Sequence, residues 1–169
     1  MKRITALLLA IALILSLSGC IQKKNTFTFK NRDSSWSMEI PKEFVKDKEV
    51  NDDQQKALNT YFKTENGITL VINETKDEEL EINEELIIEE IGIDPYIKVD
   101  RYDTIEIKDV GKAYGAVVKD NATGVAMLYY RLKHGDNAIS FILHRKGSFT
   151  PEQEAKATAM ISTFKGIKK

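Results

Sequence analysis

The sequence is poor in the residues from which most catalytic and metal sites are built. Its 169 residues include one cysteine, two histidines and three prolines. A single cysteine allows neither a disulfide within the chain nor a zinc site of several cysteines. The sequence also lacks a G-x-S-x-G nucleophile elbow, a phosphate-binding glycine loop and the D-x-[DN]-x-[DN]-G calcium loop. We therefore expect no enzyme, no cofactor and no metal site.

Long apolar runs are absent except at the N-terminus. There Lys2 and Arg3 precede the stretch 4–17, in which Thr5 and Ser16 are the only polar residues. A helix of this length spans roughly 21 Å, which is shorter than the roughly 30 Å hydrocarbon core of a bilayer. The basic start and the short apolar run are typical of a signal peptide.

The stretch Leu17-Ser18-Gly19-Cys20 resembles the lipobox of bacterial lipoprotein signal peptides. The resemblance implies a signal peptide over 1–19, cleavage before Cys20, and attachment of acyl chains such as palmitate to Cys20. The alternative is an ordinary secretory signal with an incidental cysteine. Because two or three acyl chains bind a bilayer stably, we expect anchoring to the cell membrane on its extracytoplasmic face.

The mature chain predicts one domain. Residues 20–25 form a short polar tether, and 26–169 are one domain's worth of sequence, large enough for a substantial core. Removal of the signal peptide takes away two basic residues and leaves 23 basic against 26 acidic residues, a net charge of −3. Binding to nucleic acid needs a basic face, so we expect no nucleic-acid partner.

The first half of the domain predicts strands and one helix. Alternation of polar and apolar residues indicates strands at 26–29 and 35–40, and 46–56 is polar enough to be a loop. Asn66-Gly67 lies between two strand-like stretches, 57–65 and 68–74, and favours a type I′ hairpin turn. Asn83 is the expected N-cap of a short helix, and Gly92 is the expected C′ residue just past its end. The apolar side of the helix consists of Leu86, Ile87, Ile88 and Ile91.

The second half predicts a meander of strands followed by a helix. The expected strands are 104–108, 114–119, 125–132 and 137–144. Thr150-Pro151-Glu152-Gln153 is a capping box with proline at the first helical position. The helix has an apolar stripe of Ala157, Met160, Ile161 and Phe164 and should end at Gly166. This order of elements predicts an α+β domain, with helices flanking an antiparallel sheet.

The stretch SSWSMEIPKEF, residues 34–44, resembles the opening of PsbP-like domains, with Trp36, Pro41 and Phe44 at the aromatic, proline and bulky positions. The segment from Ile161 to Lys165 resembles the end of their closing helix. The resemblance covers roughly residues 26–166 and implies an antiparallel β-sheet flanked by helices. Relatives include extrinsic photosystem II subunits, a Ran-binding transport factor and bacterial lipoproteins, which share a fold used for docking.

Candidate site residues beyond Cys20 are few. His134 and His144 flank the last hairpin, where they should lie far apart on the solvent side. Eight acids between 77 and 90 suggest calcium binding or, as the default, a solvated acidic face. Tyr129 and Tyr130 are adjacent, so one should enter the core and the other should pack across strands or join a contact patch.

These observations favour a membrane-anchored binding or accessory module with a protein partner in the cell envelope. The first alternative is a cell-envelope hydrolase that acts through two carboxylates, because any two acids of the domain could meet in a pocket. The second alternative is a sensor of a small ligand.

Overall fold

A computed structural model describes residues 25–47 and 59–167 of the chain. The predicted signal peptide, its cleavage site and Cys20 lie outside these residues. The described elements in chain order are β1 (Thr26–Lys30), β2 (Trp36–Pro41), β3 (Val45–Lys46), β4 (Asn59–Lys63), β5 (Thr69–Lys76), α3 (Glu84–Gly92), β6 (Ile97–Ile107), β7 (Gly111–Asp120), β8 (Val125–His134), β9 (Asn137–Lys146), α4 (Pro151–Ile161) and β10 (Lys165–Gly166).

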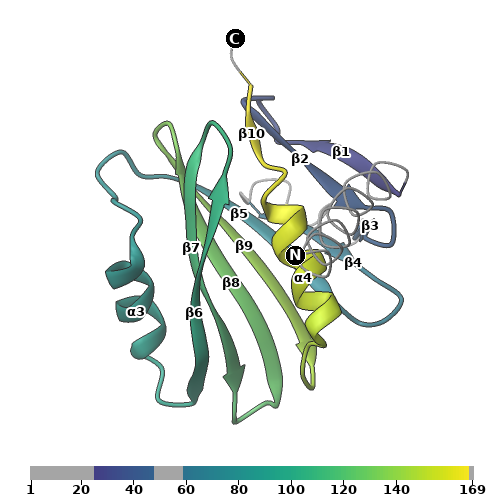
Figure 1. Cartoon of the computed structure of the whole chain (residues 1–169), viewed down its shortest axis with the longest axis vertical. Coiled ribbons are helices and arrows are strands. Elements are labelled where there is room, and N and C mark those ends of the chain that lie inside the picture. The colour runs from purple at the N-terminus through teal and green to yellow at the C-terminus, as the bar shows by residue number, and fades with distance from the viewer. Residues whose placement is uncertain (1–24, 48–58, 168–169) are drawn as a thin grey trace, which may run out of the picture.

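Two antiparallel sheets form the framework. The large sheet has seven strands in the order β3-β4-β5-β9-β8-β7-β6, and the small sheet has three in the order β1-β2-β10. All strands within both sheets pair antiparallel. The predicted α+β class, with an antiparallel sheet flanked by helices, is confirmed. Figure 1 shows α3 beside the β6–β7 end of the large sheet, and α4 near the small sheet.

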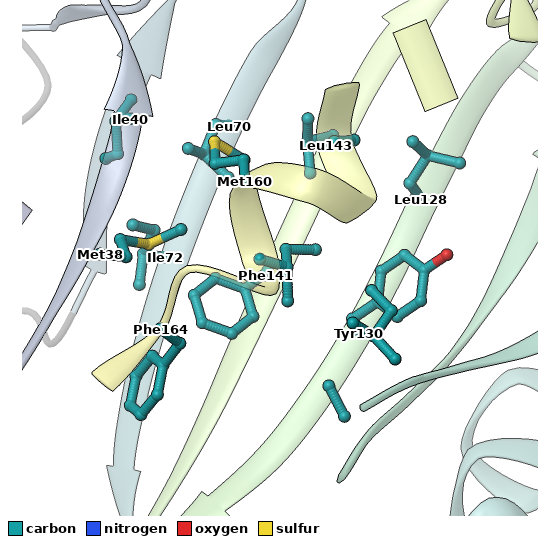
Figure 2. Close-up of a cluster of buried hydrophobic side chains, with 14 of the residues drawn as sticks. Met38, Ile40, Leu70, Ile72, Leu128, Tyr130, Phe141, Leu143, Met160 and Phe164 are labelled. Carbon is teal, nitrogen blue, oxygen red and sulfur yellow. The ribbon is translucent and has the colours of Figure 1, made fainter. Parts of the chain in front are cut away.

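The main core lies between one face of the large sheet and a layer made of α4 and the small sheet. Alternate residues of β8 point into it, namely Leu128, Tyr130 and Leu132, and all three are fully buried. Figure 2 shows side chains from β2, β5, β8, β9 and α4 converging in this layer. Burial of each large apolar side chain contributes about 1.5–3 kcal/mol, so this layer supplies most of the driving force for folding.

A second, smaller core lies on the other face of the large sheet, under α3. Ile87 of α3 is fully buried against Ala116 and Val118 of β7, with Tyr129 of β8 packed at the side. Between them, Val117 points into the main core. The unbroken apolar run 116–118 is therefore explained by a strand that is covered on both faces.

Both predicted helix starts are confirmed by their caps. The Asn83 side chain accepts a hydrogen bond from the Leu86 amide at 2.9 Å. At α4, Thr150 Oγ1 accepts from the Gln153 amide and Gln153 Oε1 accepts from the Thr150 amide, which completes the predicted capping box. These caps satisfy amides that have no partner within the helix.

The predicted helix ends are wrong. Gly92 belongs to α3, and the C-cap is Ile93 in a right-handed helical conformation. Helix α4 ends at Ile161 with Ser162 as its C-cap, and Gly166 instead pairs with Trp36 in β10. A glycine stops a helix when it adopts a positive φ, and neither Gly92 nor Gly166 does so.

The type I′ turn predicted at Asn66-Gly67 is also wrong. The Thr64 amide donates to the Ile68 carbonyl at 2.9 Å, and the Gly67 amide donates to the Thr64 carbonyl at 3.1 Å. Gly67 has a φ of +73°, whereas Asn66 has no positive φ. The loop therefore has three residues, a type I turn closed by a left-handed glycine.

Several strands are longer or more numerous than predicted. Strand β6 starts at Ile97, seven residues before the expected start, because its whole length pairs with β7 past an irregularity between Val99 and Arg101. The two-residue strands β3 and β10 have no counterpart in the prediction. Strands this short have no alternation of their own and exist only through pairing with β4 and β2.

Candidate binding surface

Cys20 and the rest of the N-terminal segment lie outside the described residues, so the lipid attachment stays a prediction. Within 25–47 and 59–167, no helix is both long and apolar enough to cross a bilayer.

The two histidines lie at the predicted register positions and far apart. His134 pairs with Asn137, and His144 pairs with Met127 at the other end of the hairpin. Both side chains are partly buried, and the predicted solvent-side position is wrong for His134, whose ring packs on the main core. The His134 ring packs edge-on against Phe164, with ring centroids 5.4 Å apart. Burial lowers the pKa of His144. The two histidines therefore form no common site.

The adjacent tyrosines point to opposite faces of the large sheet, as predicted. Tyr130 enters the main core, where its hydroxyl donates to Asp103 Oδ2 at 2.9 Å. Tyr129 lies under α3, and its hydroxyl donates to Glu90 Oε2 at 2.8 Å. Burial raises the pKa of Tyr129 to about 12 and also raises that of Tyr130. Neither ring belongs to an exposed contact patch.

The acids from 77 to 90 divide into inward and outward groups. Glu90 turns inward, where it accepts from Tyr129 and forms an ion pair with Arg131 of β8. This contact fastens α3 to the sheet. In the described part of the chain, no three His, Cys, Asp or Glu residues gather in an arrangement that could hold a metal ion. The acids therefore provide charge and a structural contact rather than a visible metal centre.

The outward side of α3 combines acids with exposed apolar residues. The segment 77–97 contains nine acidic residues and no basic residue. Three large apolar side chains in it are exposed: Ile88 by 43%, Ile93 by 77% and Tyr96 by 61%. At 100° per residue, Glu85 and Glu89 lie opposite the buried Ile87 and point to solvent. We call the set Glu84, Glu85, Ile88, Glu89, Ile93, Asp94 and Tyr96 the α3 surface.

The backbone that carries the α3 surface is fixed by contacts with the large sheet and with the β7–β8 turn. Below it, Ile87 is fully buried in the second core and Glu90 binds Arg131. Behind it, the Asn121 amide donates to the Tyr96 carbonyl at 3.0 Å, which ties the segment after α3 to the β7–β8 turn. The backbone is thus held in place while Ile93 and Tyr96 point outward. An exposed apolar patch with a polar rim is typical of an interaction site.

Sequence reasoning found the acids of this surface but missed its apolar part. Ile88 was expected on the buried side of the helix, and the structure shows that this assignment is wrong. The available signal was Ile93 and Tyr96, which stand on either side of Asp94-Pro95, a dipeptide that favours a turn. Large apolar residues in such a turn are candidates for exposure.

Comparison with known proteins supports the fold. No protein-family model and no curated protein matches the sequence. The solution structure of cyanobacterial PsbP (CyanoP) from Synechocystis superimposes with a TM-score of 0.56, covering 85% of this chain and 93% of that one at 9% identity. The Ran-binding protein Mog1p from Saccharomyces cerevisiae superimposes with a TM-score of 0.54, covering 84% and 95%, also at 9% identity.

A Bacteroides thetaiotaomicron protein superimposes with a TM-score of 0.52 at 12% identity, and the overlap covers 86% of this chain and 49% of that protein. Identities this low establish a shared fold and nothing about the site. The predicted PsbP-like fold is thereby confirmed. No residue of the α3 surface takes a role from these proteins.

Proposed function

We propose that the protein is a lipid-anchored binding module that docks a basic surface of another envelope protein on the α3 surface. The observation that carries this proposal is the exposure of Ile93 and Tyr96 beside a segment of purely acidic charge. Apolar side chains give affinity to a protein interface, and surrounding charges select the partner.

The charge of the segment determines the kind of partner. Two of the nine acids are compensated, Glu78 by Lys76 and Glu90 by Arg131. The other seven, in a segment without a basic residue, create a negative potential that attracts Lys-rich or Arg-rich surfaces and repels acidic ones. The same charge is repelled by anionic lipid headgroups. A domain tethered through residues 20–25 would therefore turn the α3 surface away from the membrane and toward partners in the envelope.

The fold neighbours are compatible with this role. Mog1p is named as a Ran-binding protein, which supports protein binding as a role for this fold. The carboxylate-based hydrolase and the small-ligand sensor stay alternative predictions.

Site-specific photocrosslinking tests the proposal. A photoreactive amino acid replaces Tyr96 in the full chain in living cells, and the matched control replaces Val45, which is 66% exposed on β3 at the opposite edge of the large sheet. We expect a discrete crosslinked product from position 96 and none from position 45. The Glu85→Lys/Glu89→Lys double variant should abolish the product, because it reverses the charge beside the crosslinker.

Equal crosslinking from both positions would show non-specific contact and contradict the proposal. Crosslinking from position 96 that survives the charge reversal would exclude a basic partner.

A further inference from the structure

A cavity of about 160 Å³ opens beside the N-terminal half of α4, on the opposite face of the large sheet from α3. Its apolar lining comes from several elements and consists of Phe44, Ile68, Leu143, Phe149, Ala157 and Met160. All but Phe149 are buried members of the main core. Polar residues also line the open side of the cavity, namely Thr64, Asn66, Thr150 and Gln153. The volume is close to the roughly 150 Å³ of an apolar cavity that holds one benzene molecule, so it is sufficient for a single ring.

The charged residues that line the cavity are two carboxylates and one ammonium group. Glu43 stands between β2 and β3, and Glu152 stands in the first turn of α4. Lys156 Nζ binds Glu152 Oε1 at 3.1 Å. That hydrogen bond raises the pKa of Lys156, and the charge of Glu43 adds to the effect. The rim therefore carries a net negative charge, and its one cation already has a partner.

The start of α4 gives little attraction for an anion. Its capping box uses the Thr150 and Gln153 side chains to satisfy two amides. Gln153 Oε1 also accepts from Arg145 Nη1 at 2.8 Å. An anion here would be repelled by the carboxylates of Glu43 and Glu152, whereas a cation would be attracted by both.

We propose that this cavity binds a small organic cation whose ammonium group lies one or two carbons from a ring-sized apolar group. The apolar group fills the cavity against Ala157 and Met160, and the ammonium group lies between Glu43 and Glu152. This site is separate from the α3 surface, and its existence does not depend on the proposed docking function.

Methyl NMR of methionine gives a direct readout. The chain has four methionines, of which Met160 lines the cavity, Met127 lies under α3 on the other face, and Met38 lies in the core. The full chain, labelled with ¹³C-methyl methionine in nanodiscs of zwitterionic lipid, is titrated with benzylamine at pH 7. We expect a saturable shift of the Met160 signal and an unchanged Met127 signal.

Three comparisons make the result specific. Benzyl alcohol should bind several-fold more weakly than benzylamine, and phenylacetate should not bind. Glu43→Gln should weaken benzylamine binding about threefold, as expected for one exposed ion pair, and leave benzyl alcohol unchanged. Ala157→Leu should abolish the shift by filling the cavity, and unchanged Met38 and Met127 signals would show that the variant is folded.

Two outcomes would overturn the proposal. The first is the absence of a saturable Met160 shift, or a shift that persists in folded Ala157→Leu, because the cavity would then hold no ligand. The second is equal affinity for benzylamine and benzyl alcohol, because the carboxylates would then have no role in recognition. Neither outcome bears on crosslinking from position 96, which tests the other face.

Discussion

Gly115 of β7 lies directly opposite Tyr130 of β8, and the Tyr130 ring occupies the space that a side chain at 115 would need. A Cβ atom at this position would overlap both the Tyr129 carbonyl oxygen and the Tyr130 ring. A glycine inside a strand usually weakens the strand. Here the missing side chain leaves room for the ring of the fully buried Tyr130 to lie over the neighbouring strand β7. Tyr130 in turn donates to Asp103 of β6, so one glycine positions a contact that links three strands.

Gly115→Ala should destabilise the fold by about 1–3 kcal/mol, because the Tyr130 ring or the β8 backbone must move to accept the methyl group. Chemical denaturation of the purified chain measures the free energy of unfolding. Gly92→Ala is the matched control, since Gly92 lies in α3 with no atom within 4 Å of the added Cβ. It should stabilise by about 0.5–1 kcal/mol through helix propensity. Equal effects of the two substitutions would contradict the steric role of Gly115.

Glu74→Ala should loosen the small sheet from the large one. The Glu74 carboxylate accepts from Trp36 Nε1 at 3.2 Å, Asn137 Nδ2 at 2.8 Å and Asn31 Nδ2 at 3.2 Å. Asn31 Nδ2 keeps Asp33 and Ser35 as acceptors, whereas Trp36 Nε1 and Asn137 Nδ2 lose the carboxylate to which they donate. Loss of an acceptor for partly buried donors costs about 1–3 kcal/mol.

Fluorescence of Trp36, the only tryptophan, reports the change without labelling. Its emission in the folded Glu74→Ala variant should shift to longer wavelength. Glu74→Gln, which keeps one acceptor oxygen, should show a smaller loss of stability. Unchanged emission and stability in Glu74→Ala would show that the contact does not hold the two sheets together.

His144 should make the protein less stable in mild acid. Burial lowers its pKa below the ordinary histidine value of 6.5, so the unfolded chain takes up a proton at a higher pH than the folded chain does. The contribution of neutral His144 to the free energy of unfolding is therefore fully present above pH 6.5. It falls as the pH drops from 6.5 toward the folded-state pKa, and below that pKa it is lost completely.

Thermal unfolding between pH 5 and 8 measures this effect, and His144→Gln should flatten the part of the profile that His144 causes. His134→Gln serves as the comparison, since His134 lies at the other end of the same hairpin. An unchanged slope in His144→Gln would show that this side chain is not the source.

Cys20→Ala should abolish lipid labelling and release the domain from the membrane. Cells that express the wild type or the variant are fed an alkyne fatty acid and fractionated, and intact mass is measured. We expect label only on the wild type, with a mature chain that begins at residue 20. Label on the variant, or a mature chain with another start, would contradict lipid attachment at Cys20.

Local signals predicted most elements correctly because each depends on neighbouring residues. The Thr150–Gln153 capping box and the Asn83 N-cap are hydrogen bonds across three residues, and the structure confirms both. The alternation around Trp36, Met38 and Ile40 predicted β2 in the same way, since side chains in a strand alternate between faces.

Predictions failed where a residue's state depends on a distant partner. The start of β6 depends on its pairing with β7, and Gly166 joins β10 only because Trp36 of β2 lies beside it. The exposure of Ile88 depends on which side of α3 meets the sheet, and α3 is too short for its pattern to determine that. The cavity combines residues from 41 to 160, so no sequence window could contain it.

The sequence by itself determined the α+β class, the helix caps and the acidic charge of 77–97, and the anchor at Cys20 stays a prediction from it. These are properties of short stretches, in which propensity, charge and hydrogen bonding act over a few residues. Only the tertiary structure decided the strand order, the exposure of Ile93 and Tyr96, and the cavity beside α4. Those features follow from the free energy of burying apolar surface over the whole chain, which pairs distant residues and leaves others exposed.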